Sequence, residues 1–291
     1  TVGEWIARAR RALLMTGTPM ENRVEEFGVL VGHVNPGLAG ELEPGTGLLG
    51  PRAFRAAVGP VYLRRNQADV LTELPPRIEA LDWVTMTGAD LDAYRAAVAS
   101  GNFMAMRQAA YAPGDVAGSA KLERLVDIVG EASREGVKVG VFSVFLAVLD
   151  ATVAAVGDRA LGPLTGALAP GERQALVDEF TGRPGPAVLV SQIQAGGVGL
   201  NIQAGSVVIL TEPQWKPSSE EQAIARCHRM GQARSVQVHR LLAEESVDER
   251  MRAVLAGKAD LFDEYARPSA LKDATPDAAD ISDLRLTQEV A

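Results

Sequence analysis

The sequence is poor in the residues on which several common kinds of site depend. Its 291 residues include one cysteine, Cys227, which excludes an internal disulfide and a zinc site built on several cysteines. The three histidines, His33, His228 and His239, are too scattered to predict a metal cluster. No apolar run reaches membrane-spanning length, and the first residues lack the zones of a signal peptide. We therefore expect a soluble, cytoplasmic protein with no metal site and no membrane contact.

The charge balance is acidic, with 29 Lys and Arg against 37 Asp and Glu. A net charge of −8 excludes a uniformly basic coat for nucleic acid, but it leaves room for a local basic groove. A hydrophobic content of 47% is enough for one large domain or two of ordinary size. The sequence starts at Thr1 within a charged amphipathic stretch, so we expect a part of a longer protein.

The first 75 residues combine apolar segments with strong turn signals. The run from Arg10 to Pro19 ends in Thr-Gly-Thr-Pro, which predicts a buried strand that stops in a turn. Apolar residues spaced three and four apart predict a helix over Glu21–Val34, and a second one is predicted at Arg52–Val58. The segment Gly37–Pro51 is rich in Gly and Pro and predicts a loop. A break at Leu74-Pro75-Pro76 predicts the boundary of a first domain, residues 1–75.

Strands and helices alternate from residue 76 to residue 267. An alternating pattern predicts a strand at 77–86, and short apolar runs predict strands at 137–143, 161–164, 187–190, 207–210 and 236–242. Helical patterns fill most of the intervals, at 122–134, 146–156, 170–180, 218–230 and 247–265. This alternation predicts an α/β domain with a parallel sheet covered by helices on both faces. Residues 268–291 are polar and acidic and predict a loose tail.

Two loops after predicted strands have unusual compositions, and ligands of open parallel sheets bind beyond the carboxyl ends of the strands. The loop from Ser191 to Asn201 holds three glycines within four positions, which lets the backbone approach a phosphate or ribose. A tight strand-to-helix turn that needs small residues is the alternative. The second loop, Glu212–Pro217, has two prolines that stiffen it around Trp215. This indole could stack on a partner or nucleic acid, or pack half-buried within the loop.

The segment from Gln222 to Gln232 is the most informative. On the predicted helix Gln222, Arg226 and Arg229 are spaced at i, i+4 and i+7, which places them on one face. Ser218 and Glu221 predict a capping box at its start, and Gly231 predicts its end. Two adjacent guanidiniums repel each other unless they face an anion, and a polyphosphate satisfies both. A solvated helix face with ordinary surface arginines is the alternative.

Taken in order, these segments resemble the Swi/Snf-type helicase-like ATPases of helicase superfamily two. The motifs that carry the resemblance are Thr-Gly-Thr-Pro-Met-Glu-Asn at 16–22, Leu63-Arg64-Arg65, Leu74-Pro75-Pro76, Ala195 to Asn201, and Gln222 to Gln232. The resemblance covers residues 10–255, and several motifs in one order are far more specific than any one alone. It implies two RecA-like lobes that hold ATP with Mg in their cleft, grip double-stranded DNA, and remodel protein complexes on that DNA.

The resemblance also implies roles for individual residues. Arg226 and Arg229 resemble paired arginine fingers that reach ATP bound to the other lobe. Residues that it implies in nucleotide binding and coupling are Gln222, Gly197, Gly199, Asn201, Thr16, Gly17 and Thr18. Candidate DNA contacts are Phe142, Ser143, Thr165, Gly166, Ser191 and Trp215. Three positions depart from the family pattern: Ala225 and Glu212 each stand where Asp is usual, and Lys216 stands where Asn is usual.

The sequence lacks the motifs with which such proteins bind phosphate and metal. No G-x-x-x-x-G-K-[ST] loop and no Asp-Glu-x-His box occurs, so the resemblance implies the end of the first RecA-like lobe followed by the whole second lobe. ATP and Mg would then be held mainly by the missing first lobe, and the chain alone would be inactive. Two alternatives stay open: a non-catalytic lobe that binds DNA or protein, and a strand-separating helicase of the same superfamily.

Overall fold

The computed structural model describes residues 2–16, 24–41, 51–63, 73–111, 116–195 and 200–253. They form two compact units, one within residues 2–63 and the other within residues 73–253.

The first unit is helical. Its elements are α1 (Val2–Ala7), α2 (Val24–Val34), α3 (Pro36–Glu41), α4 (Pro51–Val58) and the 3-10 turn η2 (Gly59–Val61). Phe27 and Val31 of α2 are buried against Phe54 and Val58 of α4. The ring of Phe27 lies edge-on to Phe54, with centroids 5.7 Å apart, and to Tyr62, at 4.7 Å. This small aromatic cluster is the core of the unit.

Two predictions for this unit are wrong. Helix α3 forms where a loop was predicted, because Asn35 Oδ1 accepts the N–H of Leu38 at 3.1 Å and Pro36 suits the first helical position. Residues 12–16 form no strand, and Leu13 and Met15 are 83% and 88% exposed. A buried parallel strand needs neighbours on both sides, and the described residues of this unit include none.

The second unit is built on a six-stranded sheet in which every pairing is parallel. Its strands are β1 (Arg77–Val84), β2 (Lys138–Ser143), β3 (Ala160–Leu164), β4 (Val188–Gln192), β5 (Gly205–Leu210) and β6 (Val236–Ala243), in the order β1-β6-β5-β2-β4-β3. All six were predicted, β1 from alternation and the other five from short apolar runs. The predicted parallel sheet is confirmed.

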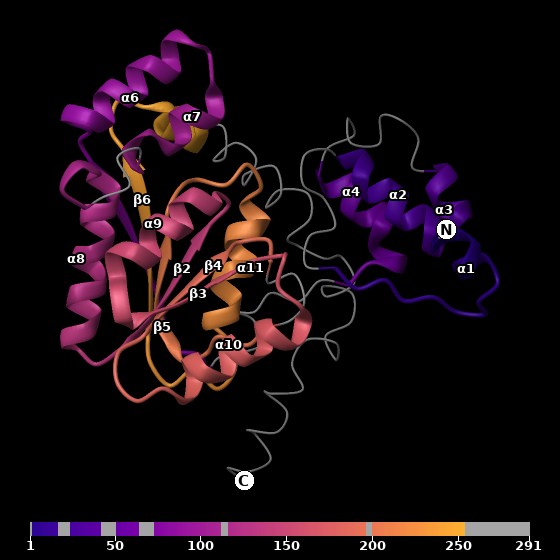
Figure 1. Ribbon diagram of the computed structural model, residues 1–291. Helices are drawn as coiled ribbons and strands as arrows, with labels where there is room; N and C mark the ends of the chain where they lie inside the picture. Colours follow the sequence, from indigo (N-terminus) through magenta and orange to yellow (C-terminus); the bar gives the residue numbers. More distant parts are fainter. Residues whose placement is uncertain are drawn as a thin grey trace. The chain divides into compact units, whose positions relative to one another are not determined.

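Helices cover both faces of this sheet (Figure 1). On one face, α8 (Ala120–Arg134) and α9 (Leu146–Val156) pack on one set of alternate strand residues. On the other, α10 (Pro170–Gly182) and α11 (Pro217–Cys227) pack on the opposite set. The central strands are buried on both sides, which explains why they read as continuous apolar runs. None of the helices in the described ranges is long and apolar enough to cross a membrane.

A helical segment between β1 and α8 was not predicted. It contains α6 (Gly88–Ala99), α7 (Phe103–Gln108) and the 3-10 turns η3 (Ala109–Tyr111) and η4 (Val116–Gly118), with α6 and α7 at one end of the sheet in Figure 1. Asp90 fastens it to α8, because its buried Oδ2 accepts the N–H of Ala120 at 2.6 Å. Burial raises the pKa of Asp90, against the effect of that hydrogen bond.

Candidate functional site

Parallel pairing brings the carboxyl ends of all six strands to one edge of the sheet. The last residues of the strands are Val84, Ser143, Leu164, Gln192, Leu210 and Ala243. Ligands of open parallel sheets bind beyond this edge, and the candidate DNA-contacting and glycine-rich loops follow these strand ends. The loops after β2, β3, β4 and β5 are therefore the place to look for a site.

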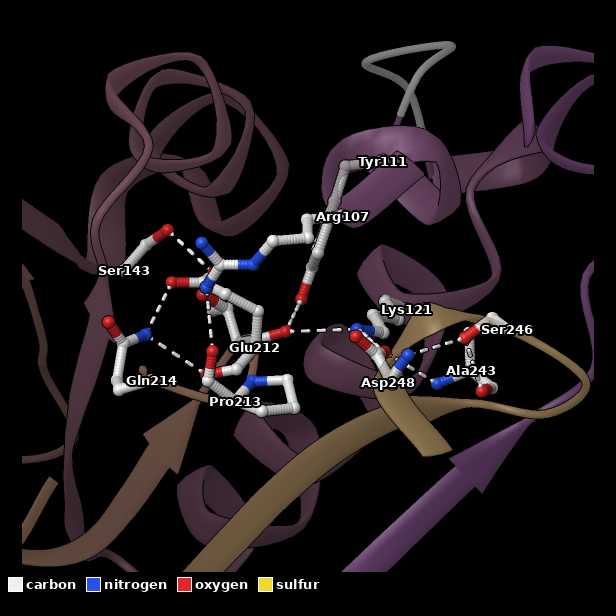
Figure 2. Close-up of polar contacts among 11 residues, drawn as sticks. Arg107, Tyr111, Lys121, Ser143, Glu212, Pro213, Gln214, Ala243, Ser246 and Asp248 are labelled. Atoms are coloured by element: carbon white, nitrogen blue, oxygen red, sulfur yellow. Dashed lines mark hydrogen bonds and ion pairs between the residues drawn. The ribbon is translucent and has the colours of Figure 1, made fainter. Parts of the chain in front are cut away.

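Glu212, which follows β5, links two of these strand ends (Figure 2). Its carboxylate is buried and accepts four hydrogen bonds: from Ser143 Oγ at 2.8 Å, the N–H of Val144 at 2.9 Å, Gln214 Nε2 at 2.8 Å, and the hydroxyl of Thr211. Burial raises the pKa of Glu212, while the four hydrogen bonds act in the opposite direction. Glu212 holds the ends of β2 and β5 together.

Arg107 joins the helical segment to the same strand ends. The residue is 4% exposed, and its Nη2 donates to the carbonyl of Pro213 at 2.6 Å. It lies over the ring of Phe145, 5.0 Å from the centroid. Burial lowers the pKa of Arg107, and the carboxylates of Glu212 and Asp248 oppose that shift. The side chain thereby ties α7 to the loops after β2 and β5.

A buried lysine extends this cluster towards the end of the second unit. Lys121 of α8 is 1% exposed, and its Nζ contacts Asp248 Oδ2 at 2.6 Å and the carbonyl of Thr211 at 3.3 Å. The hydroxyl of Tyr111 donates to the same carbonyl at 2.9 Å, and burial raises the pKa of Tyr111 well above its usual range. Asp248 also accepts the N–H of Ala243 at 3.0 Å. Figure 2 shows these contacts as one continuous set from Ser143 to Ser246.

Trp215 is half-exposed at the same edge. The residue is 47% exposed, and its indole stacks on Phe103 of α7, with ring centroids 5.8 Å apart and an interplanar angle of 18°. The prolines on either side and this stacked ring fix the indole without burying it. Both interpretations of Trp215 made from the sequence are compatible with this position.

The turn after β4, residues 193–195, is the described first part of the glycine-rich loop. The N–H of Ile193 donates to the carbonyl of Ser143 at 2.9 Å, and the N–H of Ala195 donates to that of Gln192 at 3.0 Å. Arg226 Nη1 of α11 donates to the carbonyl of Ile193 at 3.3 Å. The glycines Gly197 and Gly199 lie outside the described residues. The turn nevertheless brings Arg226 next to the loop that contains them.

The predicted shared face of Gln222, Arg226 and Arg229 is wrong, because α11 ends at Cys227 and Arg229 lies beyond it. His228 Nε2 bonds to the carbonyl of Pro75 at 2.8 Å, and Gln232 Nε2 donates to the last helical carbonyl, that of Cys227, at 3.2 Å. These contacts, one of them with a residue far away in the sequence, end the helix four residues before Gly231.

The two arginines therefore have different surroundings. Arg226 is 9% exposed, and burial lowers the pKa of its guanidinium. Its neighbour Cys227 is fully buried, and burial raises the pKa of that thiol to about 12. Gln222 and Arg229 are exposed. Of the predicted pair, Arg229 is the one that presents its side chain to solvent.

The start of α11 is held by ion pairs instead of the predicted capping box. Lys216 stands at the N-cap position without a side-chain cap, and Glu221 pairs with Arg77 at 2.7 Å. Glu220 Oε2 contacts Arg240 Nε at 2.8 Å, and Glu220 Oε1 accepts the N–H of Gln214 at 3.0 Å. These contacts fix the helix to β1, β6 and the loop after β5.

Three of the candidate DNA contacts have buried side chains. Phe142 and Ser143 are 0% exposed and Ser191 is 1% exposed. Phe142 packs in the core, and the two hydroxyls donate to Glu212 and to the carbonyl of Gln192. Their side chains support the strand ends and are not presented to a ligand. Thr165 is partly exposed and Gly166 exposed, in the loop after β3.

Two further sequence candidates, Asn201 and Thr16, lie among the described residues. Asn201 is exposed, and its side chain bonds to Gln203, with Nδ2 donating to Oε1 at 3.1 Å. Thr16 is exposed in the first unit, while Gly17 and Thr18 lie outside the described residues. Within the described ranges, no three His, Cys, Asp or Glu side chains come together as a group that could hold a metal ion.

Sequence reasoning missed the buried charges Arg107, Lys121 and Asp248. They come from three separate segments, so no local spacing connects them. The available signal was polar residues at positions where the pattern calls for apolar ones: Lys121 precedes Leu122 at the buried start of α8, and Asp248 follows Val247.

Comparison with known proteins gives two adjoining family matches. Residues 6–126 match the SNF2-related domain, and residues 120–231 match the helicase conserved C-terminal domain. An ATP-dependent helicase of Mycoplasma pneumoniae is 28% identical over 279 residues, which are 86% of this chain and 27% of that protein. The DNA repair protein RAD5B of Arabidopsis thaliana is 42% identical over 113 residues, 37% of this chain and 9% of that protein.

Among solved structures, the SWI2/SNF2 ATPase core domain of Sulfolobus solfataricus superposes with a TM-score of 0.56 at 25% identity. The match covers 86% of this chain and 60% of that one. The chain thus spans about a quarter or less of the length of the two curated relatives.

Proposed function

The chain belongs to the Swi/Snf-type family of helicase superfamily two, and from this membership we propose that it is the C-terminal part of an ATP-dependent double-stranded-DNA translocase. Its α/β fold is RecA-like. The observation that carries the proposal is the contact between Arg226 and Ile193, since it joins α11, which carries Arg226 and leads to Arg229, to the first residues of the glycine-rich loop. A nucleotide bound near α11 and DNA bound near the strand ends would then act on directly connected elements.

On the nucleotide side, we assign the role of arginine finger first to Arg229. Its exposed guanidinium can reach a triphosphate on another lobe without breaking a contact of its own with a carboxylate or carbonyl of the described residues. Arg226 must first release the carbonyl of Ile193. Binding and coupling roles are proposed for Gln222, Gly197, Gly199, Asn201, Thr16, Gly17 and Thr18.

Arg229 and Gln222 suit the phosphates of an ATP–Mg complex, but the described residues do not provide for its metal ion. An exposed guanidinium and the exposed amide of Gln222 can donate to phosphate oxygens, whereas metal coordination needs oxygen ligands that are not grouped in the described ranges. Bound Mg-ATP would supply the phosphoryl group for transfer to water. This chain would stabilise the charge that develops there, and the first RecA-like lobe would hold the phosphates and the metal.

On the DNA side, we propose that Thr165, Gly166 and Trp215 face the duplex backbone. They lie at the strand-end edge and are at least partly exposed. A hydroxyl and an indole serve contacts that do not read sequence, and a glycine lets the backbone approach closely. The buried side chains of Phe142, Ser143 and Ser191 would hold the strand ends from which these loops start. A small number of phosphate contacts is consistent with a net charge of −8.

The proposal assigns residues 1–75 to the end of the first RecA-like lobe with a helical extension, residues 76–267 to the second lobe, and residues 268–291 to a tail. Its partners are double-stranded DNA, the first lobe of the same protein, and a protein complex on the DNA. The exposed Leu13 and Met15 support this division, because a segment of the missing sheet would be expected to leave its apolar side chains uncovered.

ATP hydrolysis by the full-length protein, measured with and without duplex DNA, tests the proposed function. We expect duplex DNA to stimulate hydrolysis and the protein to displace a triplex-forming strand, which reports translocation, without separating the duplex. Hydrolysis that ignores DNA would contradict the proposal and favour a binding module. Separation of duplex strands would favour a helicase proper.

A further inference from the structure

The loop after β3 and the turn after β4 are held together by one arginine of α10. Arg173 Nε donates to the carbonyl of Leu168 at 3.1 Å, and its Nη1 donates to the carbonyl of Ala195 at 3.0 Å. A second contact runs in parallel, since the N–H of Gly166 donates to Gln192 Oε1 at 3.3 Å. Two loops from neighbouring strands therefore share a guanidinium that is half-buried between them.

The same turn is held from its other side by α11. Arg173 donates to the carbonyl of Ala195, and Arg226 donates to the carbonyl of Ile193, two residues earlier. A guanidinium can make both of its bonds at once because its N–H groups form a rigid planar fork. A continuous chain of hydrogen bonds thus runs from Leu168 through Arg173 and the turn to Arg226.

We infer that Arg173 is a positioning residue that makes the loop after β3 and the turn after β4 move as one body with α11. The inference rests on the proposed function, in which Thr165 and Gly166 face DNA and α11 faces the nucleotide. Arg173 then transmits DNA engagement to the arginines without touching either ligand. It sets how strongly DNA stimulates hydrolysis and not the DNA-free rate.

Three variants of the full-length protein test this inference: Arg173→Ala, Arg173→Lys, and Arg183→Ala as the matched control. Arg183 follows the same helix, and its side chain makes no hydrogen bond or ion pair with the described residues. Lysine keeps the charge of Arg173 but its single ammonium cannot reproduce the planar fork. We expect both Arg173 variants to lose DNA stimulation by on the order of tenfold, with the DNA-free rate and the KM for ATP within about twofold of wild type.

Two outcomes of these hydrolysis and DNA-binding measurements would overturn the inference. In the first, Arg173→Lys keeps the DNA stimulation that Arg173→Ala loses, and the DNA affinity of Arg173→Ala depends less steeply on salt, by about one phosphate contact. Arg173 would then be a direct DNA ligand. A parallel fall of the DNA-free and DNA-stimulated rates would make its role merely structural.

Amide hydrogen exchange separates this inference from the proposed function, because it needs no hydrolysis. Peptides that cover residues 165–169 and 193–195 should exchange faster together in both Arg173 variants and stay unchanged in Arg183→Ala. Unchanged exchange in the Arg173 variants would overturn the inference. A wild-type protein whose hydrolysis ignores DNA would refute the proposed function, and the exchange result would still decide whether Arg173 joins the two loops.

Discussion

Replacing Arg229 by alanine in the full-length protein should lower DNA-stimulated ATP hydrolysis by on the order of 10³-fold or more. The charge on a transferring phosphoryl group is spread over its oxygens, and a guanidinium from another lobe stabilises that charge in the transition state. Because the contact tightens in the transition state, kcat should fall far more than the affinity for ATP. Steady-state hydrolysis at saturating duplex DNA measures the effect.

The matched control is Arg234→Ala, which removes another exposed arginine a few residues along the chain. The side chain of Arg234 makes no hydrogen bond or ion pair with the described residues, so its loss should leave hydrolysis near the wild-type rate. A Lys in place of Arg229 keeps the charge but not the forked geometry and should recover only part of the rate. Wild-type turnover by Arg229→Ala would remove the arginine-finger role.

Replacing Lys121 by methionine should lower the free energy of unfolding by about 3–5 kcal/mol, because it leaves the buried carboxylate of Asp248 without its charged partner. The side chains of the pair are 1% and 3% exposed, with 2.6 Å between Lys121 Nζ and Asp248 Oδ2. Asp248 Oδ1 already lacks a partner within the described structure, so the lost contact is not replaced by another donor nearby. Urea denaturation of the chain, followed by circular dichroism, measures the change.

The double variant Lys121→Met/Asp248→Leu separates loss of a pair from loss of a single charge. It should regain much of the stability, since apolar groups of similar volume often replace a buried ion pair without net cost. The exposed pair Arg95–Asp92, at 3.8 Å, is the control, and Arg95→Ala should cost at most about 1 kcal/mol. A cost for Lys121→Met as small as that of Arg95→Ala would show that Lys121 does not fasten α8 to Asp248 and β5.

The parallel sheet was predictable from the sequence because strands that are buried on both faces are apolar along their whole length. Val188 to Val190 and Val207 to Leu210 are apolar at every position, and such runs bounded by turn residues leave few other interpretations. The family resemblance was recognisable because several short motifs, among them the glycine-rich loop and the arginine segment, follow one another in a fixed order. Both predictions are confirmed, by the sheet itself and by the domain matches.

Features fixed by tertiary contacts were not predictable. Helix α11 ends at Cys227, and the next residue, His228, bonds to the carbonyl of Pro75, which is far away in the sequence. The spacing of Arg226 and Arg229 therefore gave a wrong prediction of a shared helix face. Helix α6 contains the buried Asp90, and local sequence does not show that its carboxylate accepts the N–H of Ala120, thirty residues later. The family resemblance implied a DNA contact for Ser143, and no local pattern showed that its hydroxyl would donate to Glu212.

The central claim is that this chain supplies arginines to a nucleotide held by another lobe, and lobe complementation tests it most directly. ATP hydrolysis is measured for the chain alone, for the first RecA-like lobe alone, and for the two mixed, each with duplex DNA. We expect background turnover from either part, hydrolysis stimulated by DNA in the mixture, and no restoration when the chain carries Arg229→Ala. Turnover by the chain alone, or equal restoration by the Arg229→Ala chain, would contradict it.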